Sequence, residues 1–294
     1  MIELATPQAA SKFRSEIKPT WCPGCGDFGV LNSLQTACAT LNINPKDLVV
    51  VSGIGCSSNL PGFIHSYGMH TLHGRGVAVA QGVKLGNHAL TVVATGGDGD
   101  GYGIGVGHFI HAVRRNINMT YIVMNNQIYG LTTGQASPTT SRSVKTKSTP
   151  GGNIENALNP LGLALMGGAS FVARGFSGDA NGLAEIMTKA IAHKGFSLVD
   201  VLSPCVTYNK MNTYAWFRER VYRLEEKGHD ATNMEAALKA SLDWDQRIAL
   251  GVLYQVERPT YEEQDPATAE FGPLVTHKLG LSDSDWQAAL KEFM

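Results

Sequence analysis

Short apolar runs alternate with longer amphipathic segments along this chain, and this alternation limits the folds open to it more than any other feature. The expected strands lie at residues 49–51, 91–94, 119–124, 170–173 and 197–202. The expected helices lie at residues 28–41, 105–115, 154–166 and 181–193. The pattern predicts an α/β fold in which a parallel sheet carries helices on both faces. Ligands of such sheets bind at the carboxyl ends of the strands.

The character of the sequence changes after Pro204. Residues 210–227 and 234–247 are predicted to be charged surface helices, residues 252–256 a short strand, and the polar remainder is interrupted by prolines. We therefore expect a core domain at residues 1–205. Residues 206–294 are expected to form a C-terminal extension that wraps the core or a partner subunit, not an independent domain.

Charge and composition exclude several kinds of partner. The chain has 24 Lys and Arg against 25 Asp and Glu, a net charge of −1, which gives no basic footprint for nucleic acid or for an anionic membrane. Charged residues make up only 17%, and this low value predicts a surface partly covered by another protein. No signal peptide or membrane-spanning run is visible, so a cytoplasmic protein is expected. Its five cysteines then favour metal or redox chemistry over disulfides.

A glycine-rich loop, residues 96–101, follows one expected strand and precedes a helix. Its sequence is G-G-D-G-D-G, and glycines of this kind let backbone N–H groups approach an anion. The carboxylates of Asp98 and Asp100 would repel a phosphate unless a divalent cation lies between the carboxylates and the phosphate. Neither common nucleotide-binding fingerprint is present. Taken alone, the loop is explained equally well as a turn with capping aspartates.

A second polar pair, Asn125 and Asn126, follows the next expected strand. One βαβ unit returns the chain beside its starting loop, so these residues should lie near Asp98. A carboxylate, an amide oxygen and a backbone carbonyl suit Mg²⁺ bound to a diphosphate. The pattern G-D-G followed by N-N resembles the motif of the thiamine diphosphate-binding module in thiamine-dependent enzymes. That resemblance implies that Asp98, Asn126 and the carbonyl of Ile128 hold the Mg²⁺.

Four cysteines are expected at the same edge of the sheet. Cys22 and Cys25 form a C-x-x-C pair before a helix, Cys56 follows the first strand, and Cys205 follows the last core strand. Four thiolates can hold structural zinc or an iron–sulfur cluster, although one pair with two distant singles is untypical of zinc sites. A thioredoxin-like pair would leave Cys56 and Cys205 unexplained. Cys38 lies on the apolar stripe of a helix and is expected in the core.

Five segments occur in one order: C-P-G-C-G, G-I-G-C-S, H-G-R, G-D-G-D and N-N-Q-I-Y-G-L-T-T-G-Q-A-S-P-T. Together they resemble the β subunit of 2-oxoacid:ferredoxin oxidoreductases of the 2-oxoglutarate type, over roughly residues 20–210. The resemblance implies thiamine diphosphate, Mg²⁺ and one [4Fe-4S] cluster. It implies that the cluster ligands are Cys22, Cys25, Cys56 and Cys205.

The resemblance also implies the reaction and the partners. The reaction is the CoA-dependent oxidative decarboxylation of a 2-oxoacid, expected to be 2-oxoglutarate, to succinyl-CoA and CO₂, with electrons leaving singly to ferredoxin. Thiamine supplies the electron sink that decarboxylation needs. An α subunit supplies the glutamate that activates the aminopyrimidine, within a heterodimer that pairs as (αβ)₂. The isolated chain should be inactive, because no glutamate of this sequence falls in a pattern that would serve that role.

The predicted site residues come from these loops. The expected cofactor-binding residues are Ile54, Gly55, Cys56, Ser57, His73, Gly97, Asp98, Gly99, Asp100, Asn126, Gly130 and Leu131. His73 and Arg75, in the H-G-R segment, are candidates for catalytic contacts with the diphosphate or the substrate. A solvated loop is the alternative explanation for that segment.

Two other functions stay open at this point. The first is a thiamine-dependent lyase or carboligase without electron transfer, in which the cysteines hold structural zinc. The second is a non-catalytic iron–sulfur protein whose glycine loops are only structural. Iron content separates the first from an oxidoreductase, and retention of thiamine diphosphate separates the second.

Overall fold

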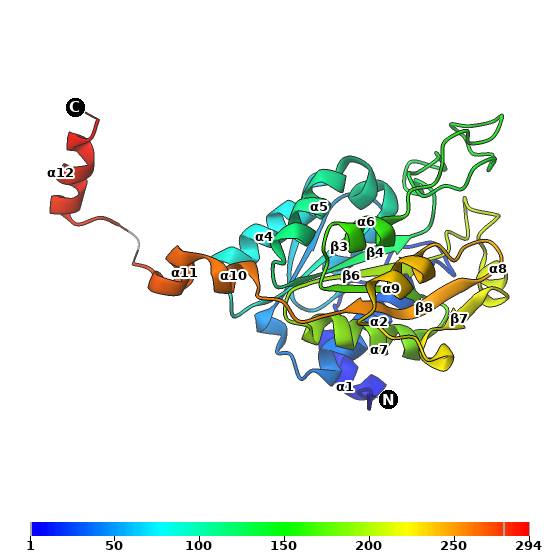
Figure 1. The fold of residues 1–294 in the computed structure, drawn as a ribbon, viewed down its shortest axis with the longest axis horizontal. Coiled ribbons are helices and arrows are strands. Elements are labelled where there is room, and N and C mark those ends of the chain that lie inside the picture. Colours follow the sequence, from blue (N-terminus) through cyan, green and yellow to red (C-terminus); the bar gives the residue numbers. More distant parts are fainter. Residues whose placement is uncertain (1, 279, 294) are drawn as a thin grey trace.

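The computed structural model describes residues 2–278 and 280–293 of the chain. Within them, eight strands form one sheet in the order β2-β1-β3-β4-β6-β5-β8-β7 (Figure 1). β1 to β6 run parallel, β8 is antiparallel to β5, and β7 is parallel to β8. The strands are β1 (Leu48–Ser52), β2 (Tyr67–His70), β3 (Thr91–Gly97), β4 (Met119–Asn125), β5 (Phe171–Phe176), β6 (Phe196–Leu202), β7 (Val221–Arg223) and β8 (Ile248–Gln255).

The sheet is buried on both faces by helices. The helices α2 (Asp27–Thr40) and α7 (Ala180–Ala192) cover one face, and α4 (Gly76–Gly86), α5 (Val106–Arg115) and α6 (Pro160–Met166) cover the other (Figure 1). Every residue of β1, β4, β5 and β6 is buried, which explains why these strands are continuous apolar runs. The predicted α/β fold with a mostly parallel sheet is confirmed.

Two elements of the core were not expected. Each residue of β2 is exposed at the edge of the sheet, so this strand lacks an apolar signature. The helix α4 contains glycines that lower its helix propensity. The predicted helix at residues 154–166 starts later, at Pro160, where Asn159 accepts a hydrogen bond from the backbone N–H of Gly162.

The region after residue 206 adds two strands to the same sheet. The predicted helix at residues 210–227 is wrong: α8 (Tyr214–Arg218), β7 and the short 3₁₀ helix η5 (Glu225–Lys227) occupy it. The predicted helix at residues 234–247 is shorter, because α9 (Met234–Ser241) ends before β8 begins. A separate apolar cluster fixes this arrangement, in which Phe217 packs with Phe176 and Leu250. The prediction was wrong because the charged residues of this region lie on a turn and an edge strand, where they are exposed to solvent just as on a surface helix.

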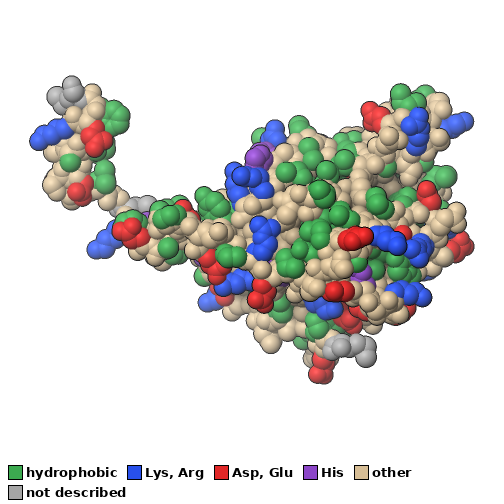
Figure 2. Space-filling model, in the orientation of Figure 1, with side chains coloured by type: hydrophobic (Ala, Val, Ile, Leu, Met, Phe, Trp, Pro, Cys, Tyr) green, Lys and Arg blue, Asp and Glu red, His purple; other side chains and the backbone are tan. Residues whose placement is uncertain are grey.

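The last part of the chain leaves the body. Its elements are α10 (Tyr261–Gln264), α11 (Pro266–Phe271), the short 3₁₀ helix η6 (Leu274–Thr276) and α12 (Asp283–Lys291). The Glu262 carboxylate anchors its start by accepting a hydrogen bond from Asn118 N at 3.1 Å. Figure 1 shows α12 standing away from the sheet and its covering helices, and Figure 2 shows hydrophobic side chains on it. That this arm packs on a partner subunit stays a prediction.

The remaining elements are short. They are α1 (Pro7–Ala10), η1 (Ser11–Phe13), η2 (Pro45–Asp47), η3 (Ser57–Asn59), α3 (Leu60–Phe63) and the π-helical turn η4 (Gly99–Ile104). None of the described helices combines the length and the apolar character needed to cross a membrane.

Candidate functional site

One open pocket, of about 500 Å³, lies at the carboxyl ends of β1, β3 and β4. All twelve residues that the sequence suggested for cofactor binding line it, and so does Ile128. Tyr129 and Thr132 complete the lining, and neither is among the twelve predicted cofactor-binding residues. The topology therefore gathers loops that are far apart in the sequence at the edge of the sheet where ligands of α/β proteins bind.

Asp98 is a buried carboxylate that two hydroxyl groups orient. Its Oδ2 accepts hydrogen bonds from Ser137 Oγ at 2.5 Å and from Thr139 Oγ1 at 2.6 Å. Burial raises the pKa of Asp98 to about 6, and the two hydroxyl donors act in the opposite direction. Both bonds go to Oδ2, so within the described residues Oδ1 is the oxygen left to face a ligand in the pocket.

The loop after β4 turns sharply at Asn126. Asn126 Oδ1 accepts a hydrogen bond from Ile128 N at 3.0 Å, which is an Asx turn, and Gln127 adopts the left-handed region with a φ of 57°. The Asn126 carbonyl accepts a bond from Asn209 Nδ2 at 2.9 Å. An amide oxygen has two lone pairs, so Asn126 Oδ1 keeps one for a cation. The carboxylate, amide and carbonyl oxygens that share this pocket are the donors that Mg²⁺ takes, and the residues fit a diphosphate-bound Mg²⁺.

Asp100 has a different task from Asp98. Its Oδ1 accepts hydrogen bonds from Ile54 N at 2.9 Å and from Gly74 N at 2.7 Å. A Cβ atom at Gly53 would lie 2.0 Å from Asp100 Oδ2, so this close approach requires glycine. Asp100 lines the pocket as predicted, but its carboxylate is used to hold two neighbouring loops of the pocket together.

The two candidate catalytic residues, His73 and Arg75, occupy different places in the structure. His73 lines the pocket, and its ring centroid lies 6.3 Å from that of Tyr129. Arg75 does not line the pocket: its Nη1 lies 3.1 Å from Nε2 of His108, on α5. The arrangement supports a contact with a ligand for His73 alone, and a catalytic role for Arg75 stays a prediction without support from this geometry.

Tyr129 is a pocket residue that the sequence reasoning missed. Its hydroxyl donates to the Gly99 carbonyl at 3.1 Å. A Cβ atom at Gly99 would lie 2.1 Å from Tyr129 Cε1, so the tyrosine ring packs directly on the glycine-rich loop of residues 96–101. We call this loop, which carries Asp98, the metal loop. Its place between Ile128 and Gly130, both already singled out, was the available signal.

The three cysteine-bearing segments meet beside this pocket. Gly26 N donates to the Pro204 carbonyl at 3.1 Å, which joins the C-x-x-C turn to the segment of Cys205. A Cβ atom built on Gly130 would lie 3.6 Å from Cys205 Sγ and 3.8 Å from Cys56 Sγ. Cys22 is exposed, whereas Cys25, Cys56 and Cys205 are half-buried. The thiols predicted as cluster ligands are therefore neighbours.

The electrostatics of these thiols reflect their proximity. Burial raises the pKa of Cys25, and it raises the pKa of Cys56 to about 11, with further upward contributions from Asp27 and neighbouring thiols. Cys38 is different: it is fully buried in the apolar core, as expected, and burial raises its pKa to about 12.

Four thiols are the donor set that an iron–sulfur cluster takes. Among residues 2–278 and 280–293, no three His, Cys, Asp or Glu side chains converge on a point where one metal ion could bind. An iron–sulfur cluster is held by four thiolates around a body of several atoms, which spaces them more widely than one ion does. Cys22, Cys25, Cys56 and Cys205 provide these thiols from three segments that contact one another.

Two residues between these segments were also missed. The buried Asp27 accepts a hydrogen bond at Oδ1 from Ser203 Oγ at 2.8 Å, and burial raises its pKa to about 6. Trp21 is packed edge-on against Phe28 and Phe63. These contacts tie the C-x-x-C turn to the body of the protein.

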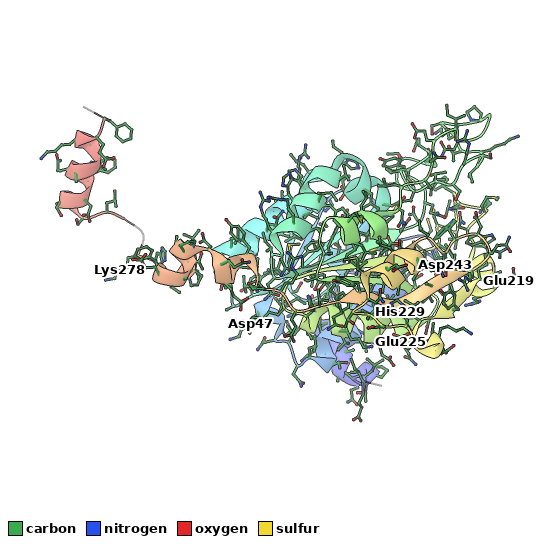
Figure 3. All side chains as sticks on the ribbon, in the orientation of Figure 1. Asp47, Glu219, Glu225, His229, Asp243 and Lys278 are labelled. Atoms are coloured by element: carbon green, nitrogen blue, oxygen red, sulfur yellow. The ribbon has the colours of Figure 1, made fainter. Side chains whose placement is uncertain are left out.

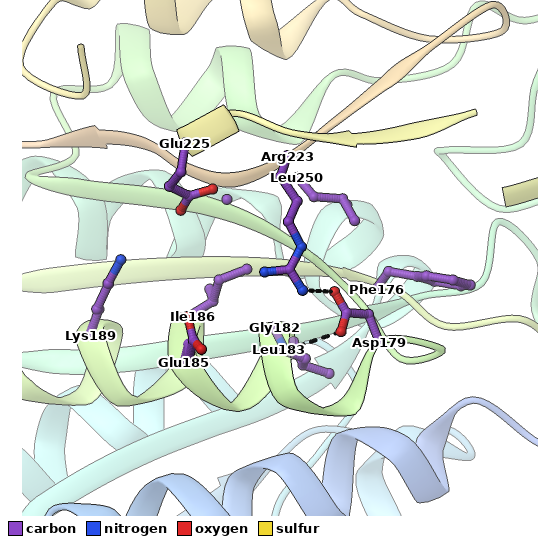
Figure 4. Close-up of a pocket in the computed structure, with 11 residues that line it drawn as sticks. Phe176, Asp179, Gly182, Leu183, Glu185, Ile186, Lys189, Arg223, Glu225 and Leu250 are labelled. Atoms are coloured by element: carbon purple, nitrogen blue, oxygen red, sulfur yellow. Dashed lines mark hydrogen bonds and ion pairs between the residues drawn. The ribbon is translucent and has the colours of Figure 1, made fainter. Parts of the chain in front are cut away.

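Two further hollows contain none of the predicted ligands. The first lies between α7 and β7, where Asp179 and Arg223 form an ion pair (Figure 4). The second lies against the buried pair of Arg174 and Asp200. Asp200 accepts a hydrogen bond from Asn125 Nδ2 at 3.1 Å, so this pair supports the end of β4 from behind.

Comparison with known proteins gives consistent matches over most of the chain. Residues 53–201 match the family "Thiamine pyrophosphate enzyme, C-terminal TPP binding domain". Residues 205–270 match the family that describes the C-terminal part of the pyruvate ferredoxin oxidoreductase beta subunit.

Individual relatives agree with these families. The chain is 47% identical over 268 residues to the "2-oxoacid:ferredoxin oxidoreductase 1, subunit beta" of Aeropyrum pernix, covering 87% of this chain and 84% of that protein. It is 38% identical to the "2-oxoglutarate synthase subunit KorB" of Methanocaldococcus jannaschii, covering 83% and 90%. A solved 2-oxoglutarate:ferredoxin oxidoreductase from Magnetococcus marinus, with 2-oxoglutarate, coenzyme A and succinyl-CoA bound, superposes with a TM-score of 0.88 at 41% identity, covering 97% and 96%.

Proposed function

The chain belongs to the β subunits of the 2-oxoacid:ferredoxin oxidoreductases, and on that premise we propose that it takes part in the oxidative decarboxylation of 2-oxoglutarate to succinyl-CoA and CO₂. One observation carries the proposal: all twelve expected cofactor residues line a single pocket, within or beside the thiamine-binding match. The choice of 2-oxoglutarate is supported by the Magnetococcus marinus enzyme, which holds this substrate, coenzyme A and succinyl-CoA.

Thiamine diphosphate, when bound, supplies the electron sink that the loss of CO₂ from a 2-oxoacid requires. The residues of this chain hold it in place. Asp98, Asn126 and the Ile128 carbonyl would hold the Mg²⁺ of the diphosphate, and the hydroxyls of Ser137 and Thr139 orient Asp98. Asp100 keeps the loop of Ile54 against this centre.

Electrons leave the pocket through the thiol site. Cys22, Cys25, Cys56 and Cys205 would hold one [4Fe-4S] cluster, which would supply single-electron transfer to ferredoxin. Cys56 is the residue common to both centres, because it lines the pocket and lies beside Cys205. The short path between the two centres supports electron transfer as the role of the thiols.

The mouth of the pocket is covered by an α subunit in an (αβ)₂ assembly. Leu72, Ile104 and Leu131 expose 75%, 54% and 55% of their surface. Leu131 lines the pocket, and Leu72 and Ile104 belong to segments that flank His73 and the metal loop. Apolar side chains gathered at the mouth of a site favour a partner surface there. The α subunit supplies the glutamate for the cofactor and part of the binding site for the 2-oxoacid and coenzyme A.

The test is anaerobic co-purification with the α subunit, followed by iron, sulfide and thiamine diphosphate quantification per β chain. About four irons and one thiamine are expected. The preparation should then reduce ferredoxin with 2-oxoglutarate and coenzyme A, faster than with pyruvate. Zinc without iron would favour a non-redox lyase, and iron without thiamine would favour a non-catalytic electron-transfer protein.

A further inference from the structure

The surface beside the cysteines is unusually basic for this chain. The three segments that surround the thiols, residues 17–26, 130–153 and 203–218, contain six Lys and Arg and no Asp or Glu. The chain as a whole has a net charge of −1. All six basic side chains are exposed: Lys18, Arg142, Lys145, Lys147, Lys210 and Arg218. These three segments are therefore positively charged in a nearly neutral chain.

Contacts within these segments place four of the basic residues around the thiols. Lys210 Nζ donates to the Val206 carbonyl at 2.6 Å, one residue after Cys205. The guanidinium of Arg218 lies 5.7 Å from the ring centroid of Tyr214. The ring of Tyr214 lies 5.9 Å from that of Phe176, which pairs with Leu202 at the end of β6, three residues before Cys205.

Lys147 and Lys18 complete the arrangement. Lys147 Nζ donates to Thr133 Oγ1 at 2.8 Å, and its backbone N donates to the Gly134 carbonyl. A Cβ atom at Gly134 would lie 3.4 Å from the ring of Tyr208, so this loop lies against the segment that follows Cys205. Lys18 is four residues before Cys22, which limits their separation to about 14 Å. We call Lys18, Lys147, Lys210 and Arg218 the basic rim.

The centre of this surface is small and partly apolar. Cys22 is exposed there, and Tyr208 and Met211 expose 39% and 57% of their surface. The acidic residues next to the segments are Glu16, Asp27, Glu155 and Glu219. Asp27 is buried, and Glu219 Oε2 pairs with Arg220 at 3.1 Å. Figure 3 shows Glu219 at the periphery of the molecule. A thiol that reaches the surface is thus surrounded by cations with few anions to cancel them.

We propose that the basic rim and the exposed side of Cys22 form the docking surface for a small acidic one-electron carrier protein. This proposal rests on the proposed function and identifies the face that delivers electrons to ferredoxin. Complementary charge raises the rate of encounter and selects the orientation of a transient partner without requiring a large buried area. An acidic carrier is favoured because the segments around the thiols contain six Lys and Arg and no Asp or Glu, and because Cys22 is exposed there.

The test uses charge reversal in the complete enzyme with its α subunit. Lys147→Glu and Lys210→Glu each place a negative charge in the rim. Lys46→Glu is the matched control, because Lys46 is exposed in η2, at the amino end of β1, on the side of the sheet opposite to Cys56. Figure 3 shows the neighbouring Asp47 far from Glu219. Reduction of ferredoxin and of methyl viologen, a small dye, is measured at low and high salt.

The proposal predicts a KM for ferredoxin raised on the order of tenfold at low salt in both rim variants, with the difference shrinking at high salt. Reduction of methyl viologen, iron content and the Lys46→Glu enzyme should match the wild type. An unchanged KM in both rim variants would overturn the docking surface. So would loss of the α subunit from them, since the face would then belong to that subunit. Absence of dye reduction by the wild-type enzyme would instead refute the proposed function.

Discussion

The indole Nε1 of Trp21 donates a hydrogen bond to the carbonyl oxygen of Cys56 at 2.6 Å. This bond joins the C-x-x-C turn to the loop that lines the cofactor pocket, across 35 residues of sequence. The ring of Trp21 is itself fixed, with centroids 5.3 Å from Phe28 and 4.9 Å from Phe63. The Trp21 side chain therefore helps to fix the position of Cys56 relative to Cys22 and Cys25.

Trp21→Phe should weaken retention of the cluster. The substitution keeps an aromatic ring but leaves the Cys56 carbonyl without its donor, at a cost of about 1–3 kcal/mol. Iron should be released several-fold faster to a chelator, while the affinity for thiamine diphosphate stays close to that of the wild type. Trp244→Phe, in the separate apolar cluster around Phe217, is the control and should not change the release of iron. Equal release from both variants would remove the role given to the Trp21 hydrogen bond.

Removing the hydroxyls that orient Asp98 should weaken cofactor binding without unfolding the protein. Ser137→Ala and Thr139→Val each delete one donor to Asp98 Oδ2. Loss of a group that orients a metal ligand typically lowers affinity roughly 10- to 100-fold. Calorimetric titration of the enzyme with thiamine diphosphate and Mg²⁺ should show this decrease, and Asp98→Ala should show a larger one. Unchanged binding in Asp98→Ala would show that this carboxylate is not a metal ligand.

Asp100→Ala should damage both the stability of the protein and its cofactor pocket. The backbone N–H groups of Ile54 and Gly74 would each lose a buried acceptor. An unsatisfied buried group costs about 1–3 kcal/mol, so the free energy of unfolding in urea should fall by that amount or more. Asp100→Asn keeps an acceptor oxygen and should restore most of it. A variant pair with equal stability would contradict this explanation.

Gly99→Ala tests whether Tyr129 is held against the metal loop. The new Cβ atom would meet the tyrosine ring at 2.1 Å, so the ring or the loop must move. We expect a loss of about 1–3 kcal/mol in the free energy of unfolding, together with weaker binding of thiamine diphosphate. Gly107→Ala is the matched control: it lies in α5, and outside its chain neighbours and the backbone of its own helix no atom lies within 4 Å of the added methyl group. That variant should be neutral or more stable in the same denaturation experiment.

Deleting residues 266–294 should affect assembly more than the stability of the core. The deleted arm exposes Phe271, Leu274, Trp286 and Phe293 by 55% or more of their surface, and such side chains are normally covered by a partner. Light scattering of the enzyme co-expressed with its α subunit should show a smaller assembly with unchanged thermal unfolding of the β chain. An intact (αβ)₂ complex would show that the arm is dispensable for association.

Much of the fold followed from the sequence because buried parallel strands are continuous apolar runs. Residues 119–124 and 197–202 were expected as strands, and β4 and β6 match them closely. The edge strand β2 is not predicted from the sequence, because its exposed residues form no apolar run. Residues 210–227 misled because their charges suit an exposed helix as well as the turn and short strand that they form.

The site also contains some residues that could be predicted from the sequence and others that could not. Residues at the ends of strands, such as Asp98 and Asn126, could be placed by counting βαβ units. The partners that hold them could not, because those contacts depend on the three-dimensional path of the loops. Ser137 lies 39 residues after Asp98, and Ser203 lies 176 residues after Asp27. No local pattern links residues at such separations.

The position of Cys56 has a consequence for how this protein fails. One residue forms part of the wall around the cofactor and lies beside the sulfur of Cys205. Oxidation of the Cys56 sulfur would distort the cofactor pocket. It would also remove one of the four proposed cluster ligands. A chain oxidised at this residue would therefore be inactive. It would not continue to turn over substrate and reduce other acceptors nearby.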